Sequence, residues 1–302
     1  MSEGLLARLR RGDVLVGDGA WGTLLMQRGL PAGQPPEWFA LESPEVVEEV
    51  ARLYLQAGAD LVTTNTFGGT AFRLRLHGLE EQIERINRQA VEAVRRGVAG
   101  RALVSASVGP TGRLLKPLGD TEPEEVEAAF AAQIAVLAAA GADLVCIETM
   151  SDLAEATRAV RAAKAVAPAL PVVATMTFQT TPRGFFTLMG VSVERAVKGL
   201  EDAGADVVGS NCGTGMEAMV SVAGDLVRHA RAPVAVQPNA GLPEGRGEQL
   251  VYRETPELMA ARVPGLLDLG VKVVGGCCGT TPAHVRALRR AVDAWRSSPA
   301  GR

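Results

Sequence analysis

The sequence is poor in several residue types on which whole classes of protein depend. Its 302 residues include four cysteines, three histidines, two tyrosines and three tryptophans. Four cysteines, two of them adjacent, do not form a disulfide framework, and in a reducing compartment they serve more often as ligands or nucleophiles. No HExxH, GxSxG or GxxxxGK[ST] motif occurs. The motifs of zinc peptidases, α/β-hydrolases and P-loop nucleotide-binding proteins are therefore missing.

Long hydrophobic runs and one-sided charge are missing as well. The longest apolar stretches, such as residues 134–140, are too short to span a bilayer. The first eleven residues contain no apolar core of a signal peptide. The net charge is −3 and both signs are interspersed, which gives no basis for a nucleic-acid or membrane-surface partner. We expect a soluble, cytoplasmic protein.

What the sequence does contain is a short repeat. Ala-Gly-Ala-Asp occurs at residues 57–60, 140–143 and 203–206, each time before a run of β-branched or apolar residues, and a variant occupies residues 269–272. Each copy fits a helix that ends at a glycine and turns tightly into a short buried strand. The repeat therefore predicts the helix-to-strand half of a β/α unit.

Eight such units can be placed along the chain. The predicted strands are Val14–Gly17, Leu61–Asn65, Ala102–Ser107, Leu144–Glu148, Val172–Thr177, Val207–Asn211, Val234–Gln237 and Lys272–Gly275. The helices predicted between and after them include Pro44–Gln56, Glu80–Arg96, Pro123–Ala139, Leu153–Ala165, Val193–Ala203, Glu217–Arg228, Pro256–Leu267 and Pro282–Ala294. This α/β pattern predicts a single-domain (β/α)8 TIM barrel over residues 1–295, with 296–302 as a polar tail or the start of a linker. An open, doubly wound sheet is the alternative.

Scarce residue types are concentrated at the carboxyl ends of the predicted strands, where parallel barrels bind their ligands. Three of the four cysteines lie there: Cys212 after the sixth strand, and Cys277 and Cys278 after the eighth. Three thiolates suit Zn²⁺, which takes three protein ligands in catalytic sites and keeps a fourth position open. Adjacent residues of a regular strand point to opposite faces. Cys277 and Cys278 can therefore both reach one metal only if the flanking glycines let the backbone kink.

The remaining cysteine and the histidines favour structural roles. Cys146 is expected to pack beneath the site, because it lies two residues before Glu148 and faces the same way. His77, His229 and His284 are expected at the surface or at helix ends. For the adjacent cysteine pair, the alternatives are two small buried thiols or a strained vicinal disulfide.

Two carboxylates, Asp18 and Glu148, also end strands. Beside thiolates and a metal they suit the recognition of an α-ammonium group, although singly an Asx turn or a helix cap would also explain them. The turn amides of Gly19 and Ala20 suit an α-carboxylate. Residues 17–22 also have the GxGxxG spacing of a dinucleotide loop, but the second predicted strand ends on Asn65 instead of the required carboxylate.

These motifs resemble the homocysteine S-methyltransferases, the family that includes the homocysteine-binding module of cobalamin-dependent methionine synthase and betaine–homocysteine methyltransferase. The likeness rests on Gly-Gly-Cys-Cys-Gly at 275–279 and Asn-Cys-Gly at 211–213. It implies a zinc-dependent (β/α)8 barrel with Cys212, Cys277 and Cys278 as the metal ligands and Asn239 as a displaceable fourth ligand. It also implies that Asp18 and Glu148 hold the homocysteine amino group.

The resemblance further implies an activity. Zinc lowers the pKa of the homocysteine thiol, and the thiolate attacks a methyl group to give methionine, without a general base. The stretch Thr64-Asn65-Thr66-Phe67 is similar to the methionine synthase branch, and we assign Asn65 to substrate binding. The expected donor is methylcobalamin on another domain or protein of a 5-methyltetrahydrofolate-dependent enzyme. The alternatives are a free-standing enzyme using S-methylmethionine or betaine, and a non-catalytic zinc- or thiol-binding barrel.

Overall fold

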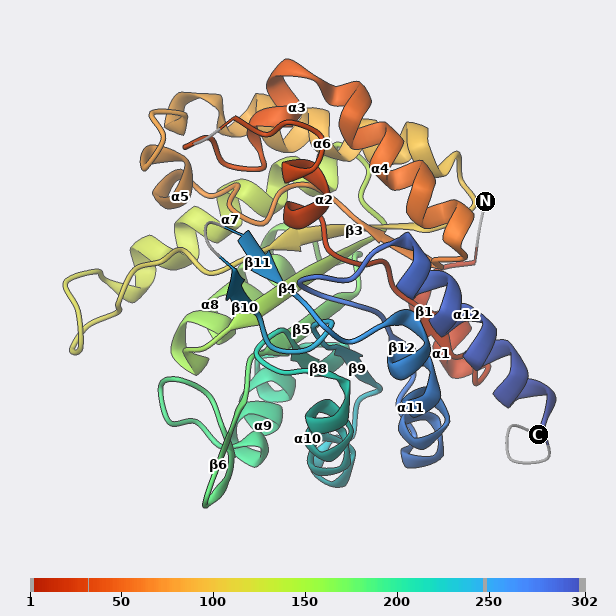
Figure 1. Cartoon of the computed structure of the whole chain (residues 1–302). Coiled ribbons are helices and arrows are strands. Elements are labelled where there is room, and N and C mark those ends of the chain that lie inside the picture. The colour runs from red at the N-terminus through yellow and green to blue at the C-terminus, as the bar shows by residue number, and fades with distance from the viewer. Residues whose placement is uncertain (1–2, 32, 247–248, 299–302) are drawn as a thin grey trace.

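Eight short parallel strands form the centre of the molecule (Figure 1). This computed structural model describes residues 3–31, 33–246 and 249–298. The strands are β1 (Leu15–Val16), β2 (Leu61–Thr63), β3 (Leu103–Val108), β4 (Leu144–Met150), β5 (Val172–Met176), β8 (Val207–Asn211), β9 (Val234–Gln237) and β12 (Val273–Val274). They are neighbours in the order β1-β12-β9-β8-β5-β4-β3-β2, and a parallel bridge between Gly17 and Leu61 joins the two edges. The predicted TIM barrel is confirmed, and the open sheet is wrong.

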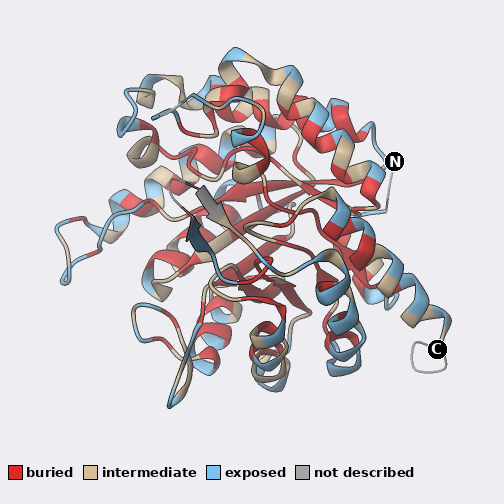
Figure 2. Ribbon diagram, viewed as in Figure 1, coloured by how far each residue is buried: buried red, intermediate tan, exposed pale blue. Residues whose placement is uncertain are grey.

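Helices surround the strands and turn their apolar faces inward, as the burial colours of Figure 2 show. They are α1 (Leu5–Arg10), α2 (Gly22–Met26), α3 (Trp38–Glu42), α4 (Pro44–Ala57), α5 (Ala71–Arg75), η1 (Glu80–Gln82), α6 (Ile83–Val98), α7 (Pro123–Ala139), α8 (Leu153–Val166), α9 (Val193–Ala203), α10 (Met216–His229), α11 (Pro256–Leu269) and α12 (Pro282–Ser297). None of these described helices has the length and apolarity needed to cross a membrane.

The repeated Ala-Gly-Ala-Asp segment has a structural role at the amino ends of the strands. Gly58 and Gly204 end α4 and α9 in the left-handed conformation, at φ +97° and +107°. The aspartate that follows accepts a hydrogen bond from the strand before it in the barrel: Val16 N–H to Asp60 (2.9 Å), Val104 N–H to Asp143 (2.7 Å) and Val172 N–H to Asp206 (2.8 Å). Each copy therefore holds two neighbouring strands in register.

Apolar side chains fill the amino-terminal end of the barrel interior. Apolar residues at the starts of the strands, such as Leu61 and Leu144, pack with Leu5 and Leu9 of α1. Cys146 is 6% exposed and belongs to the same cluster, so its predicted packing role is confirmed. Since apolar side chains fill this end, polar chemistry is left to the carboxyl ends of the strands.

Three parts of the chain differ from the prediction. Strand β12 spans only Val273–Val274, one residue shorter at each end than predicted, and both adjacent cysteines lie beyond it, as predicted. Helix α12 continues to Ser297, two residues into the predicted tail, and Arg296 Nη2 donates to Val14 O at 2.6 Å. Residues 299–302 of that tail lie outside the described residues. Two hairpins were not predicted: β6 (Gln179–Thr181) with β7 (Gly184–Phe186), and β10 (Glu244–Arg246) with β11 (Gln249–Val251).

Candidate active site

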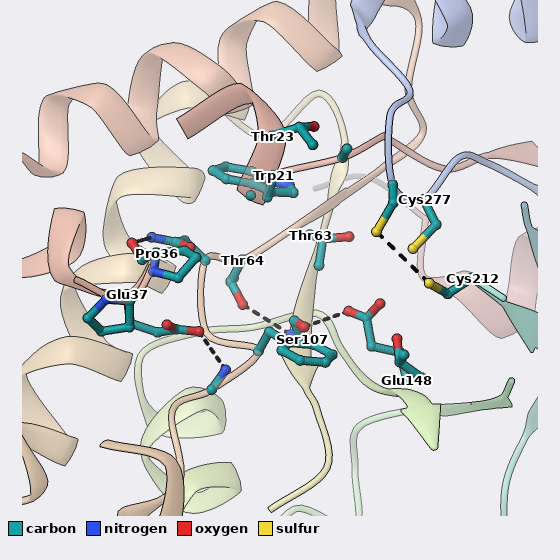
Figure 3. A pocket seen from close by; sticks show the side chains of 18 of the residues that line it. Trp21, Thr23, Pro36, Glu37, Thr63, Thr64, Ser107, Glu148, Cys212 and Cys277 are labelled. Carbon is teal, nitrogen blue, oxygen red and sulfur yellow. Dashed lines mark hydrogen bonds between the residues drawn. The ribbon is translucent and has the colours of Figure 1, made fainter. Parts of the chain in front are cut away.

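A cavity of about 460 Å³ opens at the carboxyl ends of the strands (Figure 3). Its walls come from the segments that follow β1, β2, β8 and β12 and from the carboxyl ends of β2, β3, β4 and β9. Most of the predicted site residues line it, namely Asp18, Gly19, Ala20, Asn65, Glu148, Cys212, Cys277 and Cys278. Segments far apart in the sequence thus bring thiols and carboxylates into one pocket.

The three cysteines form a tight cluster at one side of this cavity. The Sγ atoms of Cys212, Cys277 and Cys278 lie within 4.8 Å of one another, and those of Cys212 and Cys278 are 3.9 Å apart. All four cysteines of the chain are free thiols, so the predicted alternative of a vicinal disulfide is not the state described by the structure. Three convergent sulfur atoms can hold a metal ion that prefers soft ligands.

Backbone conformation aims these sulfur atoms inward. Cys212 has φ +59°, a left-handed conformation that costs about 1–3 kcal/mol for a residue with a side chain. The cysteine pair follows β12, so the alternation of a regular strand does not apply to it. Gly279 takes φ +78° immediately after the pair, and Cys277 N–H donates to Pro238 O at 2.8 Å. The expected kink beside the cysteine pair is therefore present.

The thiols share one negative charge. Hydrogen bonds from Cys277 and Cys278 lower the pKa of Cys212, which favours the thiolate form of its sulfur. The same interactions with Cys212, together with burial, raise the pKa of Cys277 and bring that of Cys278 to about 11. The cluster thus favours ionisation of Cys212 first, and a bound cation would favour ionisation of the other two thiols.

Asn239 completes the surroundings of the cluster. Its side chain is 4% exposed, and a hydrogen bond from it contributes to the low pKa of Cys212. Its Oδ1 atom is buried and has no hydrogen-bond partner among the described residues. A buried acceptor without a partner costs about 1–3 kcal/mol. A ligand at this point would remove that cost.

Asp18 is buried, and its carboxylate accepts hydrogen bonds from its own loop and from β2. Its carboxylate accepts from Thr63 N–H (2.7 Å), Thr63 Oγ1 (2.8 Å) and Trp21 Nε1 (2.8 Å). Burial nevertheless raises the pKa of Asp18 to about 6. A carboxylate buried in the 17–22 turn would repel a pyrophosphate, and α2 after it has only five residues. The turn therefore does not fit a dinucleotide.

Glu148 lies across the cavity from Trp21, below the cysteines in Figure 3. Its Oε1 accepts from Ser107 Oγ at 2.5 Å and its Oε2 from Asn211 Nδ2 at 3.3 Å. Burial raises the pKa of Glu148 to about 7, and the charge of Asp18 adds to the rise. Two carboxyl groups that are both destabilised as anions favour a cationic ligand between them.

The turn amides are partly used by the protein itself. Ala20 N–H donates to Thr280 Oγ1 at 3.1 Å, and Thr280 Oγ1 donates to Cys277 O at 2.7 Å. A Cβ on Gly19 would lie 2.7 Å from Thr280 Oγ1, so this position has no room for a side chain. The first turn is thereby fixed to the cysteine turn, and an incoming carboxylate would compete with Thr280 for the Ala20 amide.

The loops after β1 and β2 are tied together at the far side of the pocket. Asn65 Nδ2 donates to Pro36 O at 2.6 Å, and Gly68 N–H donates to Glu37 Oε1 at 2.5 Å. Burial raises the pKa of Glu37. Asn65 lines the cavity as expected, but in a loop beyond the end of β2. The hydrogen bond of its side chain is to the protein itself, so its role toward substrate remains a prediction.

The histidines do not contribute to the cysteine cluster. His229 ends α10 and is exposed, as expected. His77 is exposed and lines the rim of the cavity. His284 is at a helix end, as expected, and is buried there, at 7% exposure. Its Nδ1 accepts from Thr281 N–H in the capping box of α12.

Sequence reasoning missed the residues that hold the carboxylates in place. Thr63, Ser107 and Asn211 bind Asp18 or Glu148 through hydrogen bonds; Thr63 and Ser107 belong to no recognised motif, and Asn211 was noted only as part of the Asn-Cys-Gly motif. The available signal was their position at or near the carboxyl ends of β2, β3 and β8. Polar side chains on otherwise apolar barrel strands could have been assigned to the site on that ground.

Comparison with known proteins places the chain among enzymes of one kind. Residues 15–292 match the model of the homocysteine S-methyltransferase family. Methionine synthase from Mycobacterium tuberculosis is 35% identical over 300 residues, which cover 92% of this chain and 24% of that protein. Methionine synthase from Mycobacterium leprae is 36% identical over 299 residues, with the same shares covered. The chain thus spans about a quarter of the length of these relatives.

A solved structure with the same architecture is also similar in sequence. The metallated form of the homocysteine methyltransferase MmuM from Escherichia coli superposes with a TM-score of 0.79 at 26% identity. The match covers 94% of this chain and 98% of that one.

Proposed function

The chain belongs to the homocysteine S-methyltransferase family and is a methyltransferase, and from this premise we propose that it uses zinc to methylate the sulfur of homocysteine, giving methionine. The observation that carries the proposal is the cysteine cluster beside the unpartnered oxygen of Asn239 and two buried carboxyl groups. The cluster suits a metal, and the carboxyl groups suit an amino acid bound next to it.

The residues present fit zinc. Two thiolates on one tetrahedral zinc, each about 2.3 Å from the metal, lie about 3.8 Å apart. The Sγ atoms of Cys212 and Cys278 are 3.9 Å apart. Cys212, Cys277 and Cys278 would hold the ion, and Asn239 Oδ1 would be the weak fourth ligand that substrate replaces. When bound, zinc lowers the pKa of a coordinated thiol and so supplies a thiolate at neutral pH.

The carboxyl groups would bind the amino group of homocysteine. Glu148 accepts one hydrogen bond on each oxygen, and a carboxylate has about four acceptor sites, so it has capacity for an ammonium group. Asp18 already accepts three hydrogen bonds and would act mainly through its charge. The ammonium group would restore the ionised form of both groups, because an opposite charge lowers a carboxyl pKa.

The remaining contacts would orient and shield the substrate. The amides of Gly19 and Ala20 would receive the α-carboxylate, and Asn65 would bind the substrate from the loop after β2. Thr280 links the first of these loops to the cysteine turn, so amino-acid recognition and sulfur positioning depend on one rigid unit. No side chain need act as a general base once the thiol is ionised.

We propose methylcobalamin as the donor, presented by another domain or protein of a methionine synthase system. The walls near the cysteines contain Trp21 and Phe67 as their aromatic residues, whereas a sulfonium or ammonium donor is usually held by an aromatic cage. Betaine or S-methylmethionine is the alternative. A non-catalytic zinc barrel is disfavoured by Asn239, because a displaceable ligand suits an open catalytic site. Thiolate ligands also suit a reducing, cytoplasmic environment.

Metal content tests the site. The purified chain should contain close to one zinc, and the double variant Cys277→Ala/Cys278→Ala should lose nearly all of it, together with homocysteine-dependent activity. Cys146→Ala is the matched control, because it removes a buried cysteine outside the cluster. Elemental analysis gives the stoichiometry. A full equivalent of zinc in the double variant would refute the assignment of the ligands.

Methyl transfer to homocysteine tests the donor. With zinc and homocysteine, the protein should demethylate free methylcobalamin slowly and show little turnover with betaine or S-methylmethionine. Loss of the methylcobalamin absorbance follows the first reaction, and quantification of methionine follows the others. Fast methionine formation from a small donor, with none from methylcobalamin, would establish the alternative.

A further inference from the structure

Residues 252–254, which lie between β11 and α11, are hydrogen-bonded to all three parts of the chain that carry the proposed metal ligands. Glu254 Oε2 accepts from Met216 N–H at 2.9 Å, at the start of α10, the helix after β8. Glu254 N–H donates to Ala240 O at 3.0 Å, in the turn after β9. Glu254 O accepts from His284 Nε2 at 2.9 Å, in the first turn of α12 after β12. A single residue therefore joins three segments that are far apart in the sequence.

Tyr252, two residues earlier, reaches the cysteine cluster itself. Its hydroxyl forms a hydrogen bond with the side chain of Cys278. A phenol is the donor in such a contact when the sulfur is a thiolate. The residues of this segment thus contact one metal ligand directly and the turns of the others through the backbone.

Glycines make room for the 252–254 segment where it crosses the ligand turns. A Cβ on Gly215, in the loop after Cys212, would overlap Glu254 Oε1. A Cβ on Gly279, next to Cys278, would overlap the ring of Tyr252. Side chains at these two positions would therefore displace the segment from the site.

The ligand turns are also hydrogen-bonded to one another. Asn239 N–H donates to Thr214 O at 2.9 Å, and Ala240 N–H donates to Cys278 O at 2.9 Å. The turn that carries Asn239 therefore lies between the two turns that carry the cysteines. A change in the position of one ligand is passed to the others, and Glu254 is bound to all three turns.

We propose that Glu254 and Tyr252 are positioning residues of the metal site. Glu254 fixes the spacing of the three ligand turns before the metal binds, and the Tyr252 hydroxyl holds the sulfur of Cys278. The inference rests on the proposed function for the identity of the metal and extends it to residues that are not ligands. Groups that orient metal ligands in this way contribute about 10–100-fold to metal affinity.

Zinc affinity tests Glu254. Glu254→Ala leaves Met216 N–H without its acceptor and should weaken zinc binding about 10–100-fold, measured by competition with a chromophoric chelator. Glu254→Gln keeps an acceptor oxygen and should restore most of the affinity. Glu155→Ala is the matched control, because Glu155 is a buried carboxyl group that accepts Thr111 N–H at 2.7 Å in the loop after β3. Wild-type affinity in Glu254→Ala, or an equal loss in Glu155→Ala, would overturn the role of Glu254.

The absorption spectrum of the Co²⁺-loaded protein tests Tyr252. Tyr252→Phe keeps the ring and removes the hydroxyl, so the charge-transfer band from thiolate to cobalt should move to longer wavelength, because a sulfur without that hydrogen bond gives up an electron more easily. A loss of stability alone would not shift the band. Tyr54→Phe is the control, since the Tyr54 hydroxyl donates to Ala20 O at 2.6 Å instead of to a sulfur. An unchanged band in Tyr252→Phe, or the same shift in both variants, would exclude the hydrogen bond to the ligand.

The reactivity of the thiols in the metal-free protein separates this proposal from the proposed function. Glu254 should hold the cysteine cluster together without a metal, so Glu254→Ala should react several-fold faster with Ellman's reagent than the wild-type and Glu155→Ala proteins. If the wild-type protein binds neither zinc nor cobalt, the proposed metal fails and the thiol rates alone decide the role of Glu254. Equal rates in the three proteins would show that Glu254 does not hold the cluster.

Discussion

Glu148 and Asp18 are weaker acids in the folded protein than they are in water. Burial raises their pKa values to about 7 and about 6, and the hydrogen bonds that they accept only limit the rise. A carboxyl group in this state binds a cation more strongly than a neutral ligand, since the cation removes the penalty of ionisation. In the proposed function, recognition of the amino acid would therefore depend on these two side chains.

Replacement of Glu148 by glutamine should weaken homocysteine binding by about 2–5 kcal/mol, because it leaves the ammonium group without its anionic partner. Binding of 4-mercaptobutyrate, the same thiol without the amino group, should change little. Calorimetry with both thiols measures the difference. Similar losses for the two ligands would show that Glu148 has a structural role.

The same residue predicts a pH dependence. Glu148 is ionised above pH 7 and protonated below it, so the preference of the wild-type protein for homocysteine over 4-mercaptobutyrate should fall as the pH drops from 8 to 6. Comparing the two ligands cancels the titration of their thiols. In Glu148→Gln the preference should vary much less over this range, and a variant with the wild-type profile would exclude Glu148 as the titrating group.

At the scale of secondary-structure elements, the repeated aspartates set the register of the barrel. Asp60 accepts from Val16 N–H and also forms ion pairs with Arg8 (2.6 Å) and Arg289 (2.9 Å). It therefore joins α1 and α12 to the seam between β1 and β2. Within the described part of the chain, the side chain of Asp143 accepts only the corresponding strand hydrogen bond, from Val104 N–H.

This difference gives a matched pair of variants. Asp143→Ala should reduce the free energy of unfolding by about 1–3 kcal/mol, the cost of one buried donor left without a partner. Asp60→Ala should cost more, because two partly buried guanidinium groups lose their counter-charge as well. Urea denaturation of both proteins measures the two losses. Equal values would mean that the ion pairs at the seam contribute nothing to stability.

How much of these elements could be predicted depended on periodicity. The eight strands and the long helices follow from apolar runs and glycine-ended helices, and their observed bounds differ by only a few residues. Helices α2, α3 and α5 have five residues each and the strands of the two hairpins have three, so they are too short to carry a periodic signal. At the site, cysteines stood out because they are scarce. Thr63 and Ser107 are common residue types, and only their position in the barrel gives them a role.

For the whole molecule, the metal would connect three neighbouring parts of the barrel. Cys212 follows β8, Asn239 follows β9 and the cysteine pair follows β12, and these strands are adjacent in the sheet. A ligand held by all three stabilises the folded state only, by about 4 kcal/mol when its free concentration is a thousandfold above its dissociation constant.

Removal of zinc with a chelator should therefore lower the melting midpoint by several degrees, and added zinc should restore it. Cys278→Ser should melt at a lower midpoint that zinc changes little. Cys146→Ala should keep the full difference between the loaded and the stripped protein. Differential scanning calorimetry measures all three. If the chelator does not change the melting midpoint of the wild-type protein, zinc is either not bound or bound elsewhere.

The repeated aspartates, Asp60, Asp143 and Asp206, lie at the amino ends of the strands. The cysteine cluster and the carboxyl groups of Asp18 and Glu148 lie at the opposite ends. For protein engineering, this separates the mutations that improve production from those that alter chemistry. Libraries aimed at expression or heat resistance can be confined to the segments around Asp60, Asp143 and Asp206. Libraries aimed at new thiol acceptors can vary the loops after β1 and β2, and each set can be screened on its own before the best variants are combined.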